Sequence, residues 1–208
     1  MKKIIDIDNW ERKELFNHYT AFTNPFMIVT TEIDITKLYN YSKKNNLSMY
    51  ASIGYYLLKT INNFDEFKYR YEDEQLVLFD KVNANFTDSY DGKDIFFFSV
   101  EDTNNIKDFN NNYYRIKNDY ILNERKYIEK KYNIDEVWFS CTPWFNFNAA
   151  TPPFNHDNYI PQFIWDKFKN DNGKITTHLM VMVHHGFMDG YKLGKFFNTL
   201  QENLNKIK

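Results

Sequence analysis

The chain has 208 residues, which suits one large domain or two small ones, and it can bury a substantial core without disulfides. Hydrophobic residues make up 43% and aromatic residues 19%, which excludes a disordered or fibrous chain and predicts a packed globular domain. The 26 Lys and Arg nearly balance the 28 Asp and Glu, so the net charge of -2 provides no field that would attract nucleic acid or an anionic membrane.

Cys141 is the single cysteine of the sequence. It excludes an internal disulfide and a zinc–thiolate cluster and fits a reducing compartment. No stretch approaches the ~18 apolar residues of a membrane span. We therefore expect a soluble cytoplasmic protein in which Cys141 serves packing.

The N-terminal part alternates helices with one strand. Residues Trp10–Tyr19 have helical spacing, and Phe26–Ile33 are rich in β-branched residues typical of a strand. Asp34 is placed to cap a helix from Ile35 to Lys43. Ser48 precedes apolar residues at helical intervals, which predicts a second, well-buried helix that ends at Ile61.

The middle of the chain has short alternating or aromatic runs separated by polar turns. This pattern predicts antiparallel strands. The runs are Phe67–Tyr71, Leu76–Phe79, Val82–Phe86 and Asp94–Val100.

The C-terminal half mixes both kinds of element. A long charged segment, Asn104–Tyr132, has helical periodicity, and Val137–Cys141 and Ile160–Trp165 resemble strands on either side of a loop containing Pro152 and Pro153. Residues Ile175–His184 form a predicted buried strand, and Tyr191–Leu204 form a predicted closing helix. We expect one α/β domain over residues 1–208 with a mixed or antiparallel sheet.

The segment from His184 to Gly190 has the features of a catalytic site. It follows a buried strand, and it places a histidine, a carboxylate and a glycine just before a helix. Neutral His185 could take a proton from a hydroxyl as that oxygen attacks a carbonyl, whereas Asp189 could orient the site or cap the helix. Two alternatives remain from the residues alone. His185 and Asp189 could bind a metal, although no third ligand is nearby, or the histidines could simply satisfy hydrogen bonds at a strand end.

The string His-His-x-x-x-Asp-Gly at 184–190 resembles the active-site signature of the chloramphenicol acetyltransferase family. Three further segments resemble family segments in the same order: Trp10–Tyr19, Val29–Ile35 and Ser140–Phe147. The similarity extends over nearly the whole chain. It implies an α/β fold of the α+β type, a two-layer sandwich of helices on a mixed, largely antiparallel sheet.

The resemblance also implies a mechanism. Acetyl-CoA would donate its acetyl group directly to an acceptor hydroxyl, without a metal and without a covalent acyl-enzyme. His185 would be the general base, Ser140 would donate a hydrogen bond to the oxyanion, and Arg12 would pair with Asp189 as a structural clamp. The family frame further implies a homotrimer with its sites at subunit interfaces, where CoA and acceptor enter a channel from opposite ends.

Binding residues are implied by the same alignment, and several depart from the family pattern. Ile164 stands where the family tends to have threonine, Asp88 where it has a small or apolar residue, and Asn148–Pro153 supply small residues and prolines where apolar ones are usual. A buried unpaired Asp88 would be costly, so it is expected to be exposed or to meet a cationic substrate. The implied acceptor-binding residues are Tyr19, Trp144, Phe86, Asp88 and Ile164, and the implied CoA-binding residues are Lys167 and Ser48.

Three functions fit these residues. The first is acetylation of a hydroxyl of chloramphenicol or a related small molecule, the second is the same chemistry on another alcohol or amine, and the third is a catalytically idle ligand-binding trimer. The altered acceptor positions bear on the choice between the first two. The presence of His185, Asp189, Arg12 and Ser140 together argues against the third.

Overall fold

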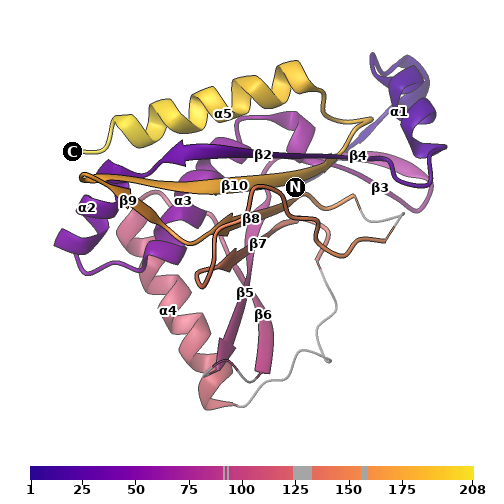
Figure 1. The fold of residues 1–208 in the computed structure, drawn as a ribbon. Coiled ribbons are helices and arrows are strands. Elements are labelled where there is room, and N and C mark those ends of the chain that lie inside the picture. The colour runs from indigo at the N-terminus through magenta and orange to yellow at the C-terminus, as the bar shows by residue number, and fades with distance from the viewer. Residues whose placement is uncertain (91, 93, 124–132, 156–158) are drawn as a thin grey trace.

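The main feature of the computed structural model, which describes residues 1–208 except 91, 93, 124–132 and 156–158, is a mixed β-sheet (Figure 1). Within those residues its strand order is β2-β10-β8-β7-β5-β6, and β9 also pairs with β10. Strand β7 is parallel to both β5 and β8, whereas the other pairs are antiparallel. The strands are β2 (Phe26–Asp34), β5 (Asn83–Tyr90), β6 (Asp94–Val100), β7 (Glu136–Thr142), β8 (Gln162–Asp166), β9 (Lys169–Asp171) and β10 (Lys174–His184).

Strand β10 lies between β2 and β8 and is buried along almost its full length. Every residue from Ile175 to His184 except His178 is buried. A strand with neighbours on both edges and a covered surface loses its polar alternation, which explains the continuous apolar run seen in its sequence. The end of this strand delivers the His184–Gly190 segment.

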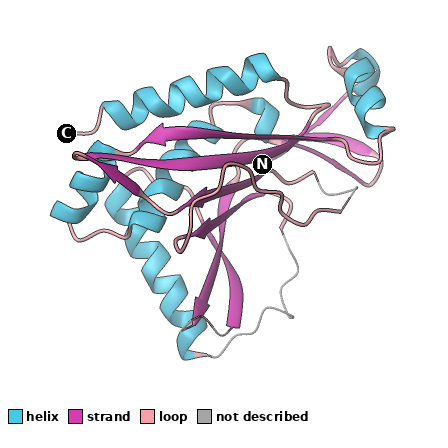
Figure 2. Cartoon of the chain, viewed as in Figure 1, coloured by secondary structure: helices cyan, strands magenta, loops and turns pink. Residues whose placement is uncertain are grey.

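Helices form the second layer (Figure 2). Helix α3 packs against α2, α4, α5 and β5, while α5 also packs along β2 and α4 along β6. Two caps foreseen in the sequence are present, since Ser48 Oγ accepts from Ala51 N and an Asp189 carboxylate oxygen accepts from Lys192 N. The helices are α2 (Thr36–Lys44), α3 (Met49–Ile61), α4 (Ile106–Leu122) and α5 (Gly190–Asn205). No helix in the described ranges is long and apolar enough to cross a membrane.

A second, smaller sheet and helix α1 (Lys13–Thr20) lie toward one end of the molecule, at the right of Figure 1. Its antiparallel strands run in the order β1 (Lys2–Ile5), β4 (Gln75–Phe79) and β3 (Tyr69–Glu72). Single 3-10 turns, η1 (Ile7–Asn9) and η2 (Asp65–Phe67), adjoin it. Phe16 of α1, Leu76 of β4 and Phe187 share one buried cluster, which packs α1 and this sheet against the turn after β10.

Side chains of β5 and β6 alternate between two faces of the large sheet. Phe96 and Phe98 are fully buried and contact the Tyr120 ring of α4, whereas Ile95 is 57% exposed on the opposite face. One of the two cavities described below lies on this opposite face, beside Ile95 and Phe97, and the other also reaches residues of α3 and α4.

The expected mixed, largely antiparallel sheet and its helical layer are confirmed. The sequence did not indicate β1 or β9, because four and three residues with exposed side chains lack a core-facing pattern. It also gave no sign that β7 pairs in parallel, since pairing direction leaves no mark on a short strand. The predicted helix over Asn104–Tyr132 is observed from Ile106 to Leu122, and its residues 124–132 lie outside the described ones.

Candidate active site

His185 follows β10 directly, and the backbone fixes its position. Its amide donates to the carbonyl of Pro25 at 2.8 Å, and its ring Nδ1 lies 2.9 Å from the carbonyl oxygen of Met188. Because a carbonyl can only accept, Nδ1 carries the hydrogen, and Nε2 of the neutral ring is left with its lone pair. The imidazole also stacks on the Tyr19 ring, with 4.0 Å between centroids and 11° between planes. The two contacts therefore fix the orientation of the imidazole and of its Nε2 lone pair.

The turn after His185 is held by Arg12. Its Nη1 donates to Asp189 at 2.9 Å, and its Nε donates to the carbonyl of Gly186 at 3.1 Å. Burial alone would raise the pKa of Asp189, but the Lys192 amide and Arg12 lower it below its usual value. Asp189 therefore stays ionised and joins α1 to the start of α5.

Gly186 is required by packing. A Cβ there would lie 2.8 Å from Phe16 Cα and 3.0 Å from the His184 ring. Phe16 backbone cannot withdraw without moving α1, so a side chain at residue 186 would displace the turn that carries His185.

Ser140 lies in β7 and lines two neighbouring cavities. One, of about 800 Å³, we call the Lys167 cavity, and the other, of about 630 Å³, the Ile164 cavity. Thr87, Ile95 and Ser140 line both. The Ile164 cavity is otherwise bounded by Trp138, Ile164 and the loop of residues 151–155. A hydroxyl at the shared wall can face ligands on both sides.

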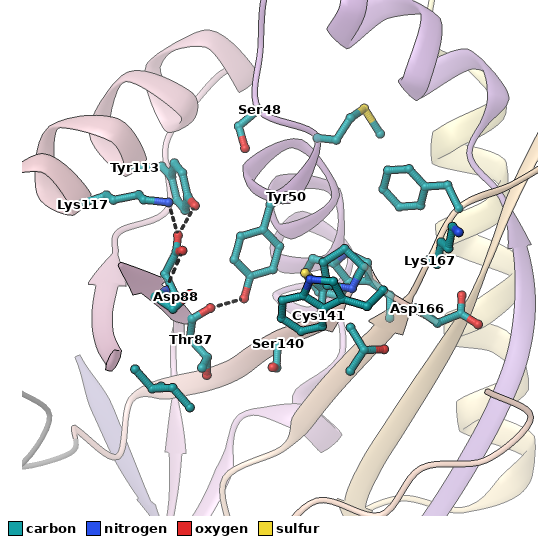
Figure 3. Close-up of a pocket in the computed structure, with 18 of the residues that line it drawn as sticks. Ser48, Tyr50, Thr87, Asp88, Tyr113, Lys117, Ser140, Cys141, Asp166 and Lys167 are labelled. Carbon is teal, nitrogen blue, oxygen red and sulfur yellow. Dashed lines mark hydrogen bonds and ion pairs between the residues drawn. The ribbon is translucent and has the colours of Figure 1, made fainter. Parts of the chain in front are cut away.

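The Lys167 cavity brings together several residues singled out in the sequence (Figure 3). Lys167 and Ser48 line it, as expected of residues assigned to one ligand, although the Ser48 hydroxyl also caps α3. Trp144 lines the same cavity and is 72% exposed. It therefore lies with the residues assigned to CoA and not in the Ile164 cavity, where an acceptor wall was expected.

Asp88 is paired within the chain. Its carboxylate accepts from Tyr113 Oη at 2.5 Å and forms an ion pair with Lys117 at 2.8 Å, at one end of the Lys167 cavity (Figure 3). Burial and the charge of Asp88 raise the pKa of Tyr113 well above its usual value, so the phenol remains a donor. The expectation of an exposed carboxylate or one waiting for a cationic substrate is corrected, because Lys117 on α4 already neutralises it.

Phe86 belongs to the core. It is fully buried, and its ring contacts Tyr50, Phe98 and Phe139. It lines neither cavity. The expected acceptor contact is therefore replaced by a packing role, because alternation along β5 turns Phe86 toward the helices and Thr87 toward the cavities.

Cys141 neighbours Ser140 but faces the other way along β7. Burial, followed by the nearby Asp88 charge, raises the pKa of its thiol to about 12. At neutral pH the sulfur is a thiol and a poor nucleophile. Cys141 is half-buried and also lines the Lys167 cavity, so its interpretation as a packing residue stays a prediction.

Within one chain the predicted catalytic residues form two groups. Arg12, Tyr19, His185 and Asp189 lie together, whereas Ser140 lies with the cavities. Neither cavity, as bounded by the described residues, includes Tyr19 or His185. A further group, Thr87, Lys117 and Asp166, was missed in the sequence because nothing local marks a residue whose partner lies on another element. The described residues also hold no cluster of three or more His, Cys, Asp or Glu suited to a metal.

Comparison with known proteins shows which of them share this fold. A probable dihydrolipoamide acetyltransferase from Listeria monocytogenes has the same fold, with a TM-score of 0.71 at 13% identity over 96% of this chain and 93% of that one. The fold is thus one found among acyltransferases.

More similar relatives narrow the class. A solved chloramphenicol acetyltransferase matches with a TM-score of 0.83 at 25% identity, over 98% of this chain and 100% of that chain. A chloramphenicol acetyltransferase from Staphylococcus aureus is 34% identical, over 95% of this chain and 93% of the relative. The family model for chloramphenicol acetyltransferase matches residues 2–201. The chain belongs to the chloramphenicol acetyltransferase family.

Proposed function

We propose that this protein is a single-domain acetyltransferase that moves an acetyl group from acetyl-CoA to a hydroxyl of chloramphenicol or a related small molecule, with His185 as the general base. The observation that carries the proposal is the Nδ1 contact of His185 with the carbonyl of Met188 at 2.9 Å. It leaves Nε2 unprotonated in the neutral ring, which is the state a base requires. The proposed role in the cell is chloramphenicol resistance in the cytoplasm.

The reaction needs one group that takes up and returns a proton and one group that donates a hydrogen bond to the oxyanion. Nε2 of His185 removes the hydroxyl proton as the acceptor oxygen attacks the thioester carbonyl, and a new C–O bond forms. The Ser140 hydroxyl donates to the resulting oxyanion, a contribution of ~3 kcal/mol to the barrier for a preorganised donor. Collapse then breaks the C–S bond, and the proton on His185 passes to the departing CoA sulfur. Arg12 and Asp189 keep the turn in place and take no part in proton transfer.

The two cavities suit two substrates. The Lys167 cavity combines an exposed aromatic ring in Trp144 with a lysine, which fits a nucleotide carrying phosphates and therefore CoA. The Ile164 cavity has largely apolar walls and fits the acceptor. Ser140 borders both, which fits its proposed position beside the carbonyl that is transferred.

The assembly completes the site. Since His185 and Ser140 belong to separate groups in one chain, we propose a homotrimer in which His185 of one subunit reaches the cavities of its neighbour. CoA would then arrive from the Lys167 side and the acceptor from the opposite end. Such cyclic symmetry repeats one interface three times and gives three equal sites.

The activity is tested by following CoA thiol release with acetyl-CoA, in the presence and absence of chloramphenicol. We expect chloramphenicol-dependent release that falls by about 10²–10⁴-fold in His185→Ala. Lys195→Ala, on the exposed side of α5, is the surface control and should retain activity. Turnover that survives His185→Ala would refute the mechanism. Turnover with other alcohols or amines alone would move the acceptor away from chloramphenicol, and no turnover with any acceptor would favour a binding role.

The shared site is tested by mixing subunits. His185→Ala and Ser140→Ala chains, unfolded together and refolded in equal amounts, would form hybrid trimers in which one interface keeps both groups. Random assembly would restore about a quarter of the wild-type activity, because three in four trimers are hybrids and each has one intact site of three. Mixtures no more active than their parents would place both groups in one subunit.

A further inference from the structure

Asp166, the last residue of β8, accepts five hydrogen bonds with a fully buried side chain. Its Oδ1 accepts from Thr177 Oγ1 and from the His178 amide, both at 2.8 Å. Its Oδ2 accepts from His178 Nδ1 at 2.7 Å, from the Phe147 amide at 3.1 Å and from Asn146 Nδ2 at 3.2 Å. One oxygen is therefore committed mainly to β10 and the other mainly to the loop that follows β7.

The carboxylate is ionised in this setting. Burial alone would raise the pKa of Asp166, but the hydrogen bonds from His178, Phe147 and Thr177 outweigh it and lower the pKa below its usual value. A buried charge of this kind is stable only while its donors stay in place. The geometry of the loop is thus coupled to the charge on Asp166.

The loop after β7 and Lys167, the residue that follows Asp166, form one edge of the Lys167 cavity. Asn146 Nδ2 also donates to the carbonyl of Lys167, and the Lys167 amide donates to the carbonyl of Phe145 at 3.2 Å. Trp144 precedes this anchored stretch and, like Lys167, lines the cavity while remaining exposed. Exposed side chains gain little from packing, so their position depends on the backbone that carries them.

We propose that Asp166 is a positioning residue for the binding of acetyl-CoA. It fixes the backbone that carries Trp144 and Lys167 at the edge of the cavity. This inference rests on the proposed function, because it takes the Lys167 cavity as the donor site. Asp166 also lines this cavity, but all five hydrogen bonds that its carboxylate accepts come from the protein, so its proposed action is through the backbone that it holds. Its loss would weaken donor binding and leave the chemical step unchanged.

Asp166→Asn isolates this role because it keeps the shape and removes the acceptor capacity of one oxygen. Whichever way the amide turns, its NH₂ group faces protein donors. On the Oδ1 side it would face the His178 amide of β10, and on the Oδ2 side it would face the Phe147 amide of the loop, and a backbone amide can only donate. The loop is exposed and β10 is not, so the loop is the part that yields.

The matched control is Thr177→Val. It removes one donor to Oδ1, keeps nearly the same volume in a buried position, and leaves the loop contacts intact. Both variants are measured for kcat and for KM toward acetyl-CoA and toward the acceptor. We expect Asp166→Asn to raise KM for acetyl-CoA by ~10-fold, with kcat and the acceptor KM within ~2-fold of wild type. Thr177→Val should change all three by less than ~2-fold.

Three results would overturn the proposal: an unchanged KM for acetyl-CoA in Asp166→Asn, a fall in kcat at constant KM, or the same rise in KM in Thr177→Val. If Asp166→Asn does not fold, Asn146→Ala decides, because residue 146 is exposed and its loss removes only the two hydrogen bonds that tie the loop to the Asp166 carboxylate and to the Lys167 carbonyl. A KM for acetyl-CoA raised by ~3-fold supports the proposal, and an unchanged KM overturns it. Wild-type activity is established first, so absence of acetyl transfer refutes the proposed function separately.

Discussion

Gly54 lies at a close contact between the helical layer and the sheet. It lies in α3, and a Cβ at this residue would be 2.4 Å from Phe86 Cζ, 2.8 Å from Phe86 Cε1 and 3.2 Å from Phe139 Cδ2. The Phe86 ring is fully buried and is enclosed by other aromatic rings, including those of Phe98 and Tyr113. Gly54→Ala would therefore force α3 away from β5.

The expected cost follows from two opposing effects. Overpacking of a filled core costs ~1–3 kcal/mol, whereas Ala is favoured over Gly in a helix interior by up to ~1 kcal/mol. Gly194→Ala in α5 is the matched control, since nothing lies within 4 Å of a Cβ there. Because the propensity gain is common to both, the difference between the two variants measures overpacking alone. We expect Gly54→Ala to be less stable than Gly194→Ala by ~1–3 kcal/mol.

Urea unfolding at one fixed protein concentration provides the measurement, because oligomer stability depends on concentration. The midpoint of Gly54→Ala should lie below those of wild type and Gly194→Ala. A Gly54→Ala midpoint equal to that of Gly194→Ala would show that Phe86 moves aside without cost, and the account of the helix–sheet contact would be wrong.

Three further outcomes are expected. Ser140→Ala should lower kcat by about 10²–10³-fold with a smaller change in KM, measured by thiol release, and a raised KM at unchanged kcat would instead indicate a contact made equally in the ground state. Lys117→Met should lower the free energy of unfolding by ~1–3 kcal/mol because it leaves the Asp88 carboxylate with fewer partners, and Asp88→Asn in the same chain should recover most of the loss. The pKa of Asp189 is lowered from 3.8, so the folded chain binds that proton less tightly than the unfolded one. Its stabilisation is complete above about pH 4 and is lost as the pH falls through the lowered value, and Asp189→Asn should flatten this acid loss in unfolding curves.

Local signals in the sequence predicted most of the fold. Ser48 and Asp189 cap α3 and α5 because capping depends on residues only two or three positions away. The unbroken apolar run of β10 likewise indicated a strand with neighbours on both sides. Such features are readable because their causes lie close together in the chain.

Features that depend on residues far apart in the chain could not be predicted from the sequence in the same way. The partner of Asp88 is Lys117, on another element, and the donors to Asp166 come from β10 and from the loop after β7. Arg70 is buried and donates to the backbone carbonyls of Ile134 and Glu136, an arrangement that no residue spacing indicates. The role of Phe86 was missed for a related reason, since the strand's orientation is set only when it pairs.

In the candidate site, too, some features were expected from the sequence and others were not. The Arg12–Asp189 ion pair was expected from the family resemblance, and the structure places the two groups 2.9 Å apart. The wall shared by the two cavities could not be foreseen, because Thr87, Ile95 and Ser140 come from three strands. Trp144 was expected beside the acceptor, and the structure places it in the Lys167 cavity together with Lys167 and Ser48.

The contact between His185 and the carbonyl three residues later has a consequence for how such a protein can change. The orientation of the His185 ring is encoded within a single short turn, whereas the walls of the Ile164 cavity are supplied by β5, β6, β7, β8 and the loop of residues 151–155. Substitutions in that loop can therefore reshape the space for a ligand without disturbing the imidazole. The proposed acceptor preference can therefore change through substitutions at positions that have no part in the proposed catalysis.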